Sequence, residues 1–155
     1  MTGPDQTLRG GALNAAISKA VVGLLSDYVG KGPPKARTIH SEKIVVCVLE
    51  DAMTKAERSL AADGKEDFVL EMRGAFQDTM RKDFTDAVEA LSGHKVVAFM
   101  SANHVEPDFA VEVFVLAEPI IAEVEAGSDA VDFDVRATKP VPGDGMAPRH
   151  AVSRA

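Results

Sequence analysis

Several residue types that often reveal a protein's class are scarce in this chain of 155 residues. The single cysteine, Cys47, excludes an internal disulfide, which fits a reducing compartment, and we expect a cytoplasmic protein. There is no tryptophan, and aromatic residues make up only 5% of the chain, so valine, leucine and alanine must fill most of the interior. No apolar run approaches the ~20 residues of a membrane-spanning helix, and the first residues lack the basic and apolar regions of a signal peptide. We therefore expect no direct insertion into a membrane.

Basic residues are also outnumbered, with 17 lysines and arginines against 24 aspartates and glutamates, a formal net charge of −7. The two short basic stretches, residues 31–37 and 81–82, form no continuous stripe. An acidic protein repels nucleic-acid phosphates unless it carries such a stripe, so we expect no nucleic-acid binding.

The apolar residues that are present recur at spacings of three and four in three segments, which predicts three helices. The first covers about residues 8–29. A short second helix, about 54–63, begins at a capping box in which Thr54 and Glu57 satisfy each other's backbone amides. The third and longest helix covers about 66–91.

Four apolar or alternating segments predict strands, at 36–40, 44–49, 95–101 and 110–116, with a polar loop over 102–108. The second strand is almost entirely apolar, which is typical of a central strand. The order α-β-β-α-α-β-β predicts an α+β fold, a two-layer sandwich whose four-stranded, mainly antiparallel sheet packs on helices.

Composition divides the chain into three parts. Residues 1–7 read as a flexible arm, and residues 8–117 as a single α+β domain. Residues 118–155 are acidic, rich in proline, glycine and alanine, and poor in apolar periodicity, so we expect a largely disordered tail.

The candidate ligands on the helices and the first strand are arginines. Arg37 follows a helix stop, where it is available to bind an anion. Arg73 lies at the edge of the apolar stripe of the third helix, and Arg81 continues that edge. The partner of Arg73 is either a bound carboxylate or an internal acid; the internal candidates are Asp78, Glu112 and Glu50.

Residues 101–108 form the most chemically varied segment, with Ser101, Asn103, His104 and Asp108 close together. No Gly-x-Ser-x-Gly elbow accompanies the serine, so the segment favours recognition over nucleophilic catalysis. His94 and His104 would lie near opposite ends of one strand, too far apart to share a metal. We expect no catalytic residue, no metal and no cofactor.

Taken together, the motifs resemble those of the MpsC-type domain family, bacterial proteins named for a Na+-translocating, membrane-potential-generating system. The resemblance covers about residues 8–117 and rests on Leu25–Gly30 with Gly32-Pro33 and Arg37, Ile44–Leu49, Thr54-x-x-Glu57, Arg73-x-x-Phe76-x-x-x-Met80-Arg81-x-x-Phe84, Gly93-x-x-Val96–Ser101 with Pro107-Asp108, and Glu112–Leu116. It implies a companion to a cation-translocating or ion-uptake membrane system, and it supplies no known reaction. Arg37, Arg73, Ser101, Asn103 and Asp108 match the family pattern.

Two functions follow as hypotheses. The first is a non-catalytic accessory or regulatory protein, a homodimer with a membrane transport protein as partner. Its motive is the apolar second strand, because a sheet covered on one face exposes the other unless a copy hides it. The alternative is an anion or small-molecule binding module with weak enzymatic activity, in which Arg37 and Arg73 share one pocket.

Overall fold

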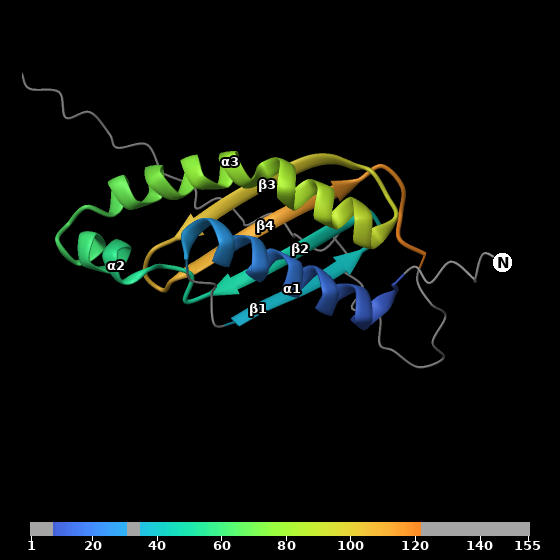
Figure 1. Ribbon diagram of the computed structural model, residues 1–155, viewed down its shortest axis with the longest axis horizontal. Coiled ribbons are helices and arrows are strands. Elements are labelled where there is room, and N and C mark those ends of the chain that lie inside the picture. The colour runs from blue at the N-terminus through green and yellow to red at the C-terminus, as the bar shows by residue number, and fades with distance from the viewer. Residues whose placement is uncertain (1–7, 31–34, 122–155) are drawn as a thin grey trace, which may run out of the picture. The chain divides into compact units, whose positions relative to one another are not determined.

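The computed structural model describes residues 8–30 and 35–121, which contain three helices and four strands (Figure 1). The elements are α1 (Gly10–Val29), β1 (Lys35–Ser41), β2 (Ile44–Glu50), α2 (Lys55–Ala62), α3 (Glu66–Ser92), β3 (Val96–His104) and β4 (Phe109–Leu116). Their order is the α-β-β-α-α-β-β order expected from the sequence, and the α+β class is confirmed. The predicted arm and nearly all of the predicted tail lie outside the described residues.

The four strands form one sheet in the order β1-β2-β4-β3, and every neighbouring pair is antiparallel. The two hairpins, β1-β2 and β3-β4, are joined where β2 pairs with β4. The apolar strand β2 is therefore central, as its composition predicted, and Cys47 on β2 stands directly opposite Glu112 on β4.

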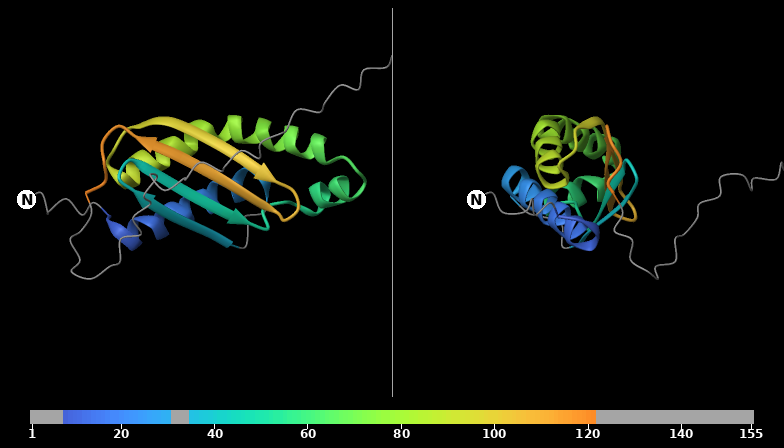
Figure 2. Two further views of the ribbon diagram at one scale, coloured as in Figure 1. Left: turned by 180° about the vertical axis from the view of Figure 1, so that it is seen from behind. Right: turned by 90° about the vertical axis from the view of Figure 1, so that its right-hand side faces the viewer.

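The helices cover a single face of this sheet, as the end-on view in Figure 2 shows. Helix α1 packs on β1 and on α3, and α3 packs on β3. The core between the two layers is apolar and includes Leu13, Ile17, Val45, Met80, Phe84 and Phe114. Cys47 lies in this core as a buried free thiol, and burial raises its pKa, which keeps it inert.

The helix ends follow local rules. The predicted capping box of α2 is present, because the Thr54 amide donates to Glu57 at 2.6 Å and the Glu57 amide donates to the Thr54 hydroxyl at 3.2 Å. Helices α1 and α3 end at Gly30 and Gly93, which adopt left-handed conformations (φ +79° and +73°) that glycine tolerates at no steric cost. These ends fix where the chain turns from helix to strand.

Strand β3 is longer than the sequence predicted, since it continues to His104 instead of ending at residue 101. Ala102, Asn103 and His104 pair with residues of β4, so only residues 105–108 remain as the connection. The ladder with β4 overrides the polar composition of this stretch. As a consequence, Ser101 and Asn103 are strand residues that point toward the helices.

Among the described residues, no helix combines the length and the apolar character needed to cross a bilayer.

Candidate functional site

A buried polar network lies between the sheet and α3, centred on Glu112. Glu112 is fully buried, because the alternation of β4 places it on the helix-facing side together with Phe114. Its Oε1 accepts a hydrogen bond from Gln77 Nε2 on α3 at 2.9 Å, and its Oε2 accepts one from the Ser101 hydroxyl on β3. An ionisable side chain is thus held in the middle of the protein by two neutral donors.

The network continues from Gln77 to helix α2. Asn103 Nδ2 donates to Gln77 Oε1 at 2.7 Å, and Arg73 Nε donates to Asn103 Oδ1 at 2.9 Å. Arg73 Nη1 then reaches Glu57 Oε2 at 3.4 Å. Arg73 and Gln77 are four residues apart on α3, so both project from one face of that helix toward the sheet. The network therefore connects β3, β4, α3 and α2.

Burial dominates the electrostatics of this network. It raises the pKa of Glu112 from 4.5 to about 7, although the hydrogen bonds from Ser101 and Gln77 and the charge of Arg73 act in the opposite direction. No lysine, arginine or histidine of the described residues contacts the Glu112 carboxylate directly, since Arg73 bonds to Asn103 and Glu57. Glu112 can therefore gain or lose a proton near neutral pH.

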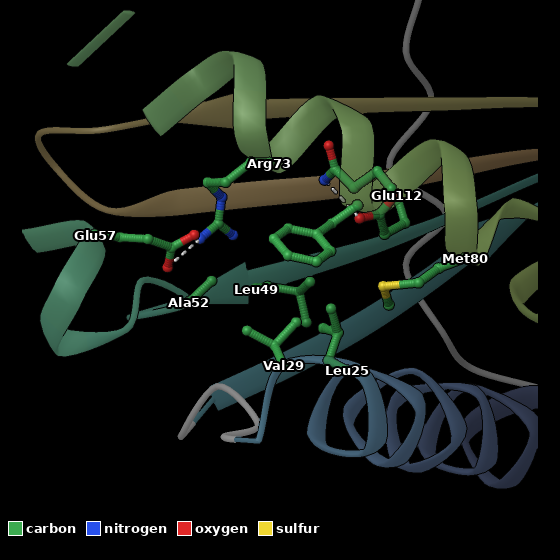
Figure 3. Close-up of a pocket in the computed structure, with 10 residues that line it drawn as sticks. Leu25, Val29, Leu49, Ala52, Glu57, Arg73, Met80 and Glu112 are labelled. Atoms are coloured by element: carbon green, nitrogen blue, oxygen red, sulfur yellow. Dashed lines mark hydrogen bonds and ion pairs between the residues drawn. The ribbon is translucent and has the colours of Figure 1, made fainter. Parts of the chain in front are cut away.

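A narrow crevice opens beside the network and is drawn in Figure 3. It encloses about 30 Å³, and its polar side chains come from α2, α3 and β4. The remaining lining is apolar and consists of Leu25, Val29, Leu49, Ala52, Phe76 and Met80. In the figure, Glu57 and Glu112 lie at opposite ends of the crevice, and Arg73 lies between them. An apolar cleft with a few convergent polar groups is the usual form of a small-ligand site.

Three of the six candidate residues chosen from the sequence lie in this network, namely Arg73, Ser101 and Asn103. Sequence reasoning named Glu112 among possible partners of Arg73, but the ion-pair partner is Glu57, which had been interpreted only as part of a cap. The role of Gln77 was missed. One pattern pointed to the site: alternation along β4 places Glu112 on the same face as Phe114 and Leu116, and the valines on the other face.

The structure does not bring Arg37 and Arg73 together. Arg37 is exposed on the side of β1 that faces away from the helices, opposite Val48 in the register. Arg73 lies on the helix side. The hypothesis that one pocket holds both arginines fails for this reason, and the crevice contains only Arg73.

Arg81 and Asp108 make contacts that join elements of the fold. The Arg81 guanidinium lies 5.1 Å from the centre of the Phe99 ring and donates to the Phe99 carbonyl at 3.2 Å, which attaches α3 to β3. Asp108 accepts from the Met53 amide at 2.9 Å and pairs with Arg58 at 3.5 Å, which ties the β3-β4 connection to the segment before α2 and to α2 itself.

The second candidate site is the sheet face that the helices leave uncovered, here called the open sheet face. Its residues alternate with those of the core, and most are apolar: Ile39, Ile44, Val46, Val48, Ala98, Met100, Ala102, Phe109, Val111, Val113 and Val115. The polar residues of the face lie on the edge strands and at the end of β2, and they are Lys35, Arg37, Ser41, Glu50 and His104. One register row shows the pattern, because Ile39, Val46, Val113 and Met100 lie side by side across all four strands. The two edge residues of that row, Ile39 and Met100, are each 53% exposed. No other described element covers this face (Figure 2).

Comparison with known proteins gives two matches. The model of the family described as "Na+-translocating membrane potential-generating system (MpsC)" matches residues 9–118. The chain is also similar to the uncharacterized protein YrhF of Bacillus subtilis (strain 168), with 30% identity over 105 residues that cover 66% of this chain and 86% of the relative. No solved structure matches the chain.

Proposed function

Because the chain belongs to the MpsC family, we propose that it is a non-catalytic accessory protein of a cation-translocating membrane system. We further propose that it is cytoplasmic and acts as a homodimer that forms through the open sheet face. The family description supplies the membrane system, and the free thiol of Cys47 suits a reducing compartment. A protein partner would then provide the contact with the membrane.

The observation that carries the dimer is the apolar character of the open sheet face. An antiparallel sheet that faces water on one side normally alternates between apolar and polar residues. In β2 and β4, the two central strands, the residues on both faces are apolar, apart from Glu50 and the buried Glu112. Contiguous apolar surface of this kind typically marks a protein interface. Two copies facing each other across a twofold axis would pack sheet on sheet.

The size of the face is compatible with a dimer. Four strands spaced ~4.8 Å apart, with about seven residues each rising ~3.3 Å, present a flat area of roughly 440 Å² per copy. Two such faces bury roughly 900 Å² before side-chain relief is counted, just under the ~1,000 Å² that is the lower limit for a biological interface. On the described strands, the charges of this face are confined to one end of β1 and of its neighbour β2, where Lys35 pairs with Glu50 at 3.3 Å and Arg37 is exposed.

Light scattering on the full chain tests the dimer. The wild-type protein should show twice its chain mass of 16.4 kDa, and a Val113→Lys variant should show a single chain mass. Val113 lies in the middle of the open sheet face, so its replacement by lysine would bury an unpaired charge in the interface. An Ala90→Lys variant on the exposed side of α3 is the matched control and should remain dimeric. A wild-type monomer at micromolar concentration would contradict the proposal.

The accessory role needs a measurement in cells. Deletion of the gene should lower the sodium-dependent membrane potential reported by a voltage-sensitive dye, and wild-type protein should restore it. The Val113→Lys variant should fail to restore it, while Ala90→Lys should succeed. An unchanged potential in the deletion strain would refute the accessory role without affecting the dimer.

A further inference from the structure

The helix layer carries an apolar surface of its own, at the place where α1 ends beside α3. Val29 is the last residue of α1, and it lines the crevice together with Phe76 of α3. Residues 66–75 come before Phe76, form a stretch roughly 15 Å long at ~1.5 Å per residue, and extend past the end of α1 (Figure 1). Helix α1 therefore leaves this flank of α3 uncovered.

The uncovered flank is aromatic. Phe68, Met72 and Phe76 are spaced four residues apart on α3, so their side chains follow one another along one face of the helix. Phe68 is 55% exposed and Phe76 is 40% exposed, and Tyr28 at the end of α1 is 42% exposed. Several large side chains exposed together typically mark a binding surface. This surface, here called the helix-layer patch, consists of Tyr28, Val29, Phe68, Met72 and Phe76.

Acidic side chains border the helix-layer patch. Two of them directly precede Phe68 and Met72 on α3, one precedes Tyr28 on α1, and one accepts a hydrogen bond from the Tyr28 hydroxyl: Asp67, Glu71, Asp27 and Asp83. The bases nearest to them among the described residues pair with other acids: Lys65 with Asp63, Arg73 with Glu57 and Lys82 with Asp86. The border of the patch is therefore negative.

This charge selects the class of partner. Nucleic acids and anionic membrane surfaces would be repelled by the four acids. The patch offers no free strand edge, so an extended segment would gain no backbone hydrogen bonds there. An amphipathic helix with lysine or arginine beside its apolar stripe fits best, because its apolar side chains pack on the aromatic rings while its basic ones pair with the acids. The crevice beside Phe76, about 30 Å³ in volume, admits the tip of one apolar side chain.

From this combination we propose that the helix-layer patch binds a basic amphipathic helix of a partner protein. Phe68 and Phe76 are separated by about 12 Å along α3, so two to three turns of the partner helix cover them. The patch lies on the helix side of the sheet, and a homodimer through the open sheet face leaves it accessible. Cytoplasmic segments of membrane proteins carry an excess of lysine and arginine. Identifying the partner as a membrane protein rests on the proposed function, whereas the binding of a basic helix does not.

Fluorescence anisotropy with the full chain and a dye-labelled synthetic peptide tests the proposal. The probe is a leucine-lysine peptide of about four turns (~16 residues) with one apolar face, measured at physiological salt. We expect saturable binding. A leucine-glutamate peptide of the same pattern, and a scrambled leucine-lysine peptide without an apolar face, should each bind at least about tenfold more weakly. Equal binding of the glutamate peptide would exclude a role for the acids, and equal binding of the scrambled peptide would exclude docking of an amphipathic helix. Either result would overturn the proposal.

Two pairs of variants locate the binding surface. Phe68→Ser should weaken binding at least about tenfold, while Val97→Ser, which removes a 64% exposed apolar side chain from β3, should leave it unchanged. Glu71→Lys should also weaken it at least about tenfold, while Glu106→Lys, which changes the net charge equally on the β3-β4 connection, should not. All four side chains are exposed, so the fold should persist.

Unchanged affinity in Phe68→Ser or in Glu71→Lys would place the peptide elsewhere and refute the proposal. The mass from light scattering and the membrane potential of the deletion strain report on the proposed function separately. A protein that fails to bind the peptide but forms the dimer and restores the potential would refute this inference alone.

Discussion

At the scale of single residues, the ionisation of Glu112 controls how the interior responds to pH. Its pKa is raised from 4.5 to about 7 in the folded chain, chiefly by burial, so the folded chain holds this proton more tightly than the unfolded chain does. The group therefore contributes its full stabilisation below pH 4.5 and loses it as the pH rises through 7. The shift corresponds to roughly 3 kcal/mol.

The first prediction concerns a Glu112→Gln variant, which stays neutral at every pH. We expect the free energy of unfolding of the wild type, relative to the variant, to fall by roughly 2–3 kcal/mol between pH 5 and pH 8.5. Urea denaturation of both proteins at the two pH values measures this difference. Parallel pH dependences in the two proteins would show that Glu112 is not the group that titrates.

The second prediction concerns the ion pair of Arg73 with Glu57, whose side chains are only 12% and 5% exposed. Replacing Arg73 with methionine keeps much of the side-chain volume but leaves the Glu57 carboxylate buried without its counter-ion. We expect a loss of about 3 kcal/mol in the free energy of unfolding. The control is Lys82→Met, since the Lys82 side chain is 82% exposed and its ion pair with Asp86 contributes less than about 1 kcal/mol. Equal losses in urea denaturation would mean that the buried ion pair of Arg73 stabilises the protein no more than an exposed pair does.

At the scale of elements, the start of α2 depends on one hydroxyl. The Thr54 side chain accepts the Glu57 amide, so we predict that Thr54→Ala destabilises the protein by about 1 kcal/mol through loss of the cap. Thr85→Ala is the matched control, because the Thr85 hydroxyl bonds to the Lys82 carbonyl within α3, where alanine is the better helix former. It should change stability by less than about 0.5 kcal/mol. Comparison of the urea midpoints distinguishes the two, and equal effects would exclude a capping role.

The elements also show where sequence reasoning succeeds. The ends of α1 and α3 and the capping box of α2 were predictable because glycine and threonine act on their immediate neighbours. The extension of β3 to His104 was not, since it arises from pairing with β4 across a turn. Polar residues such as Asn103 resemble a loop in sequence and become strand only when a partner strand is placed beside them.

At the scale of the whole molecule, the sheet separates two chemically different surfaces. The candidate ligand residues lie on both surfaces, which the sequence did not reveal. Only the strand register shows that Arg37 and Arg73 lie on opposite sides of the sheet. The inward position of Glu112 followed from alternation along β4, but its contact with Gln77 depends on how α3 crosses the sheet. The domain boundaries proposed at residues 8 and 117, and the character of the tail, stay predictions.

The last prediction follows from placing the dimer interface on the open sheet face. If two copies fold and associate together, the melting temperature must rise with protein concentration, because association stabilises only the folded chains. A hundredfold increase in concentration adds roughly 2.7 kcal/mol per dimer, which should raise the melting temperature by a few degrees. The Val113→Lys variant should melt at one temperature at all concentrations, while the Ala90→Lys control should follow the wild type. If the melting temperature of the wild type did not change with concentration, a partner other than a second copy would have to cover the apolar face, since surface of that kind is rarely left in water.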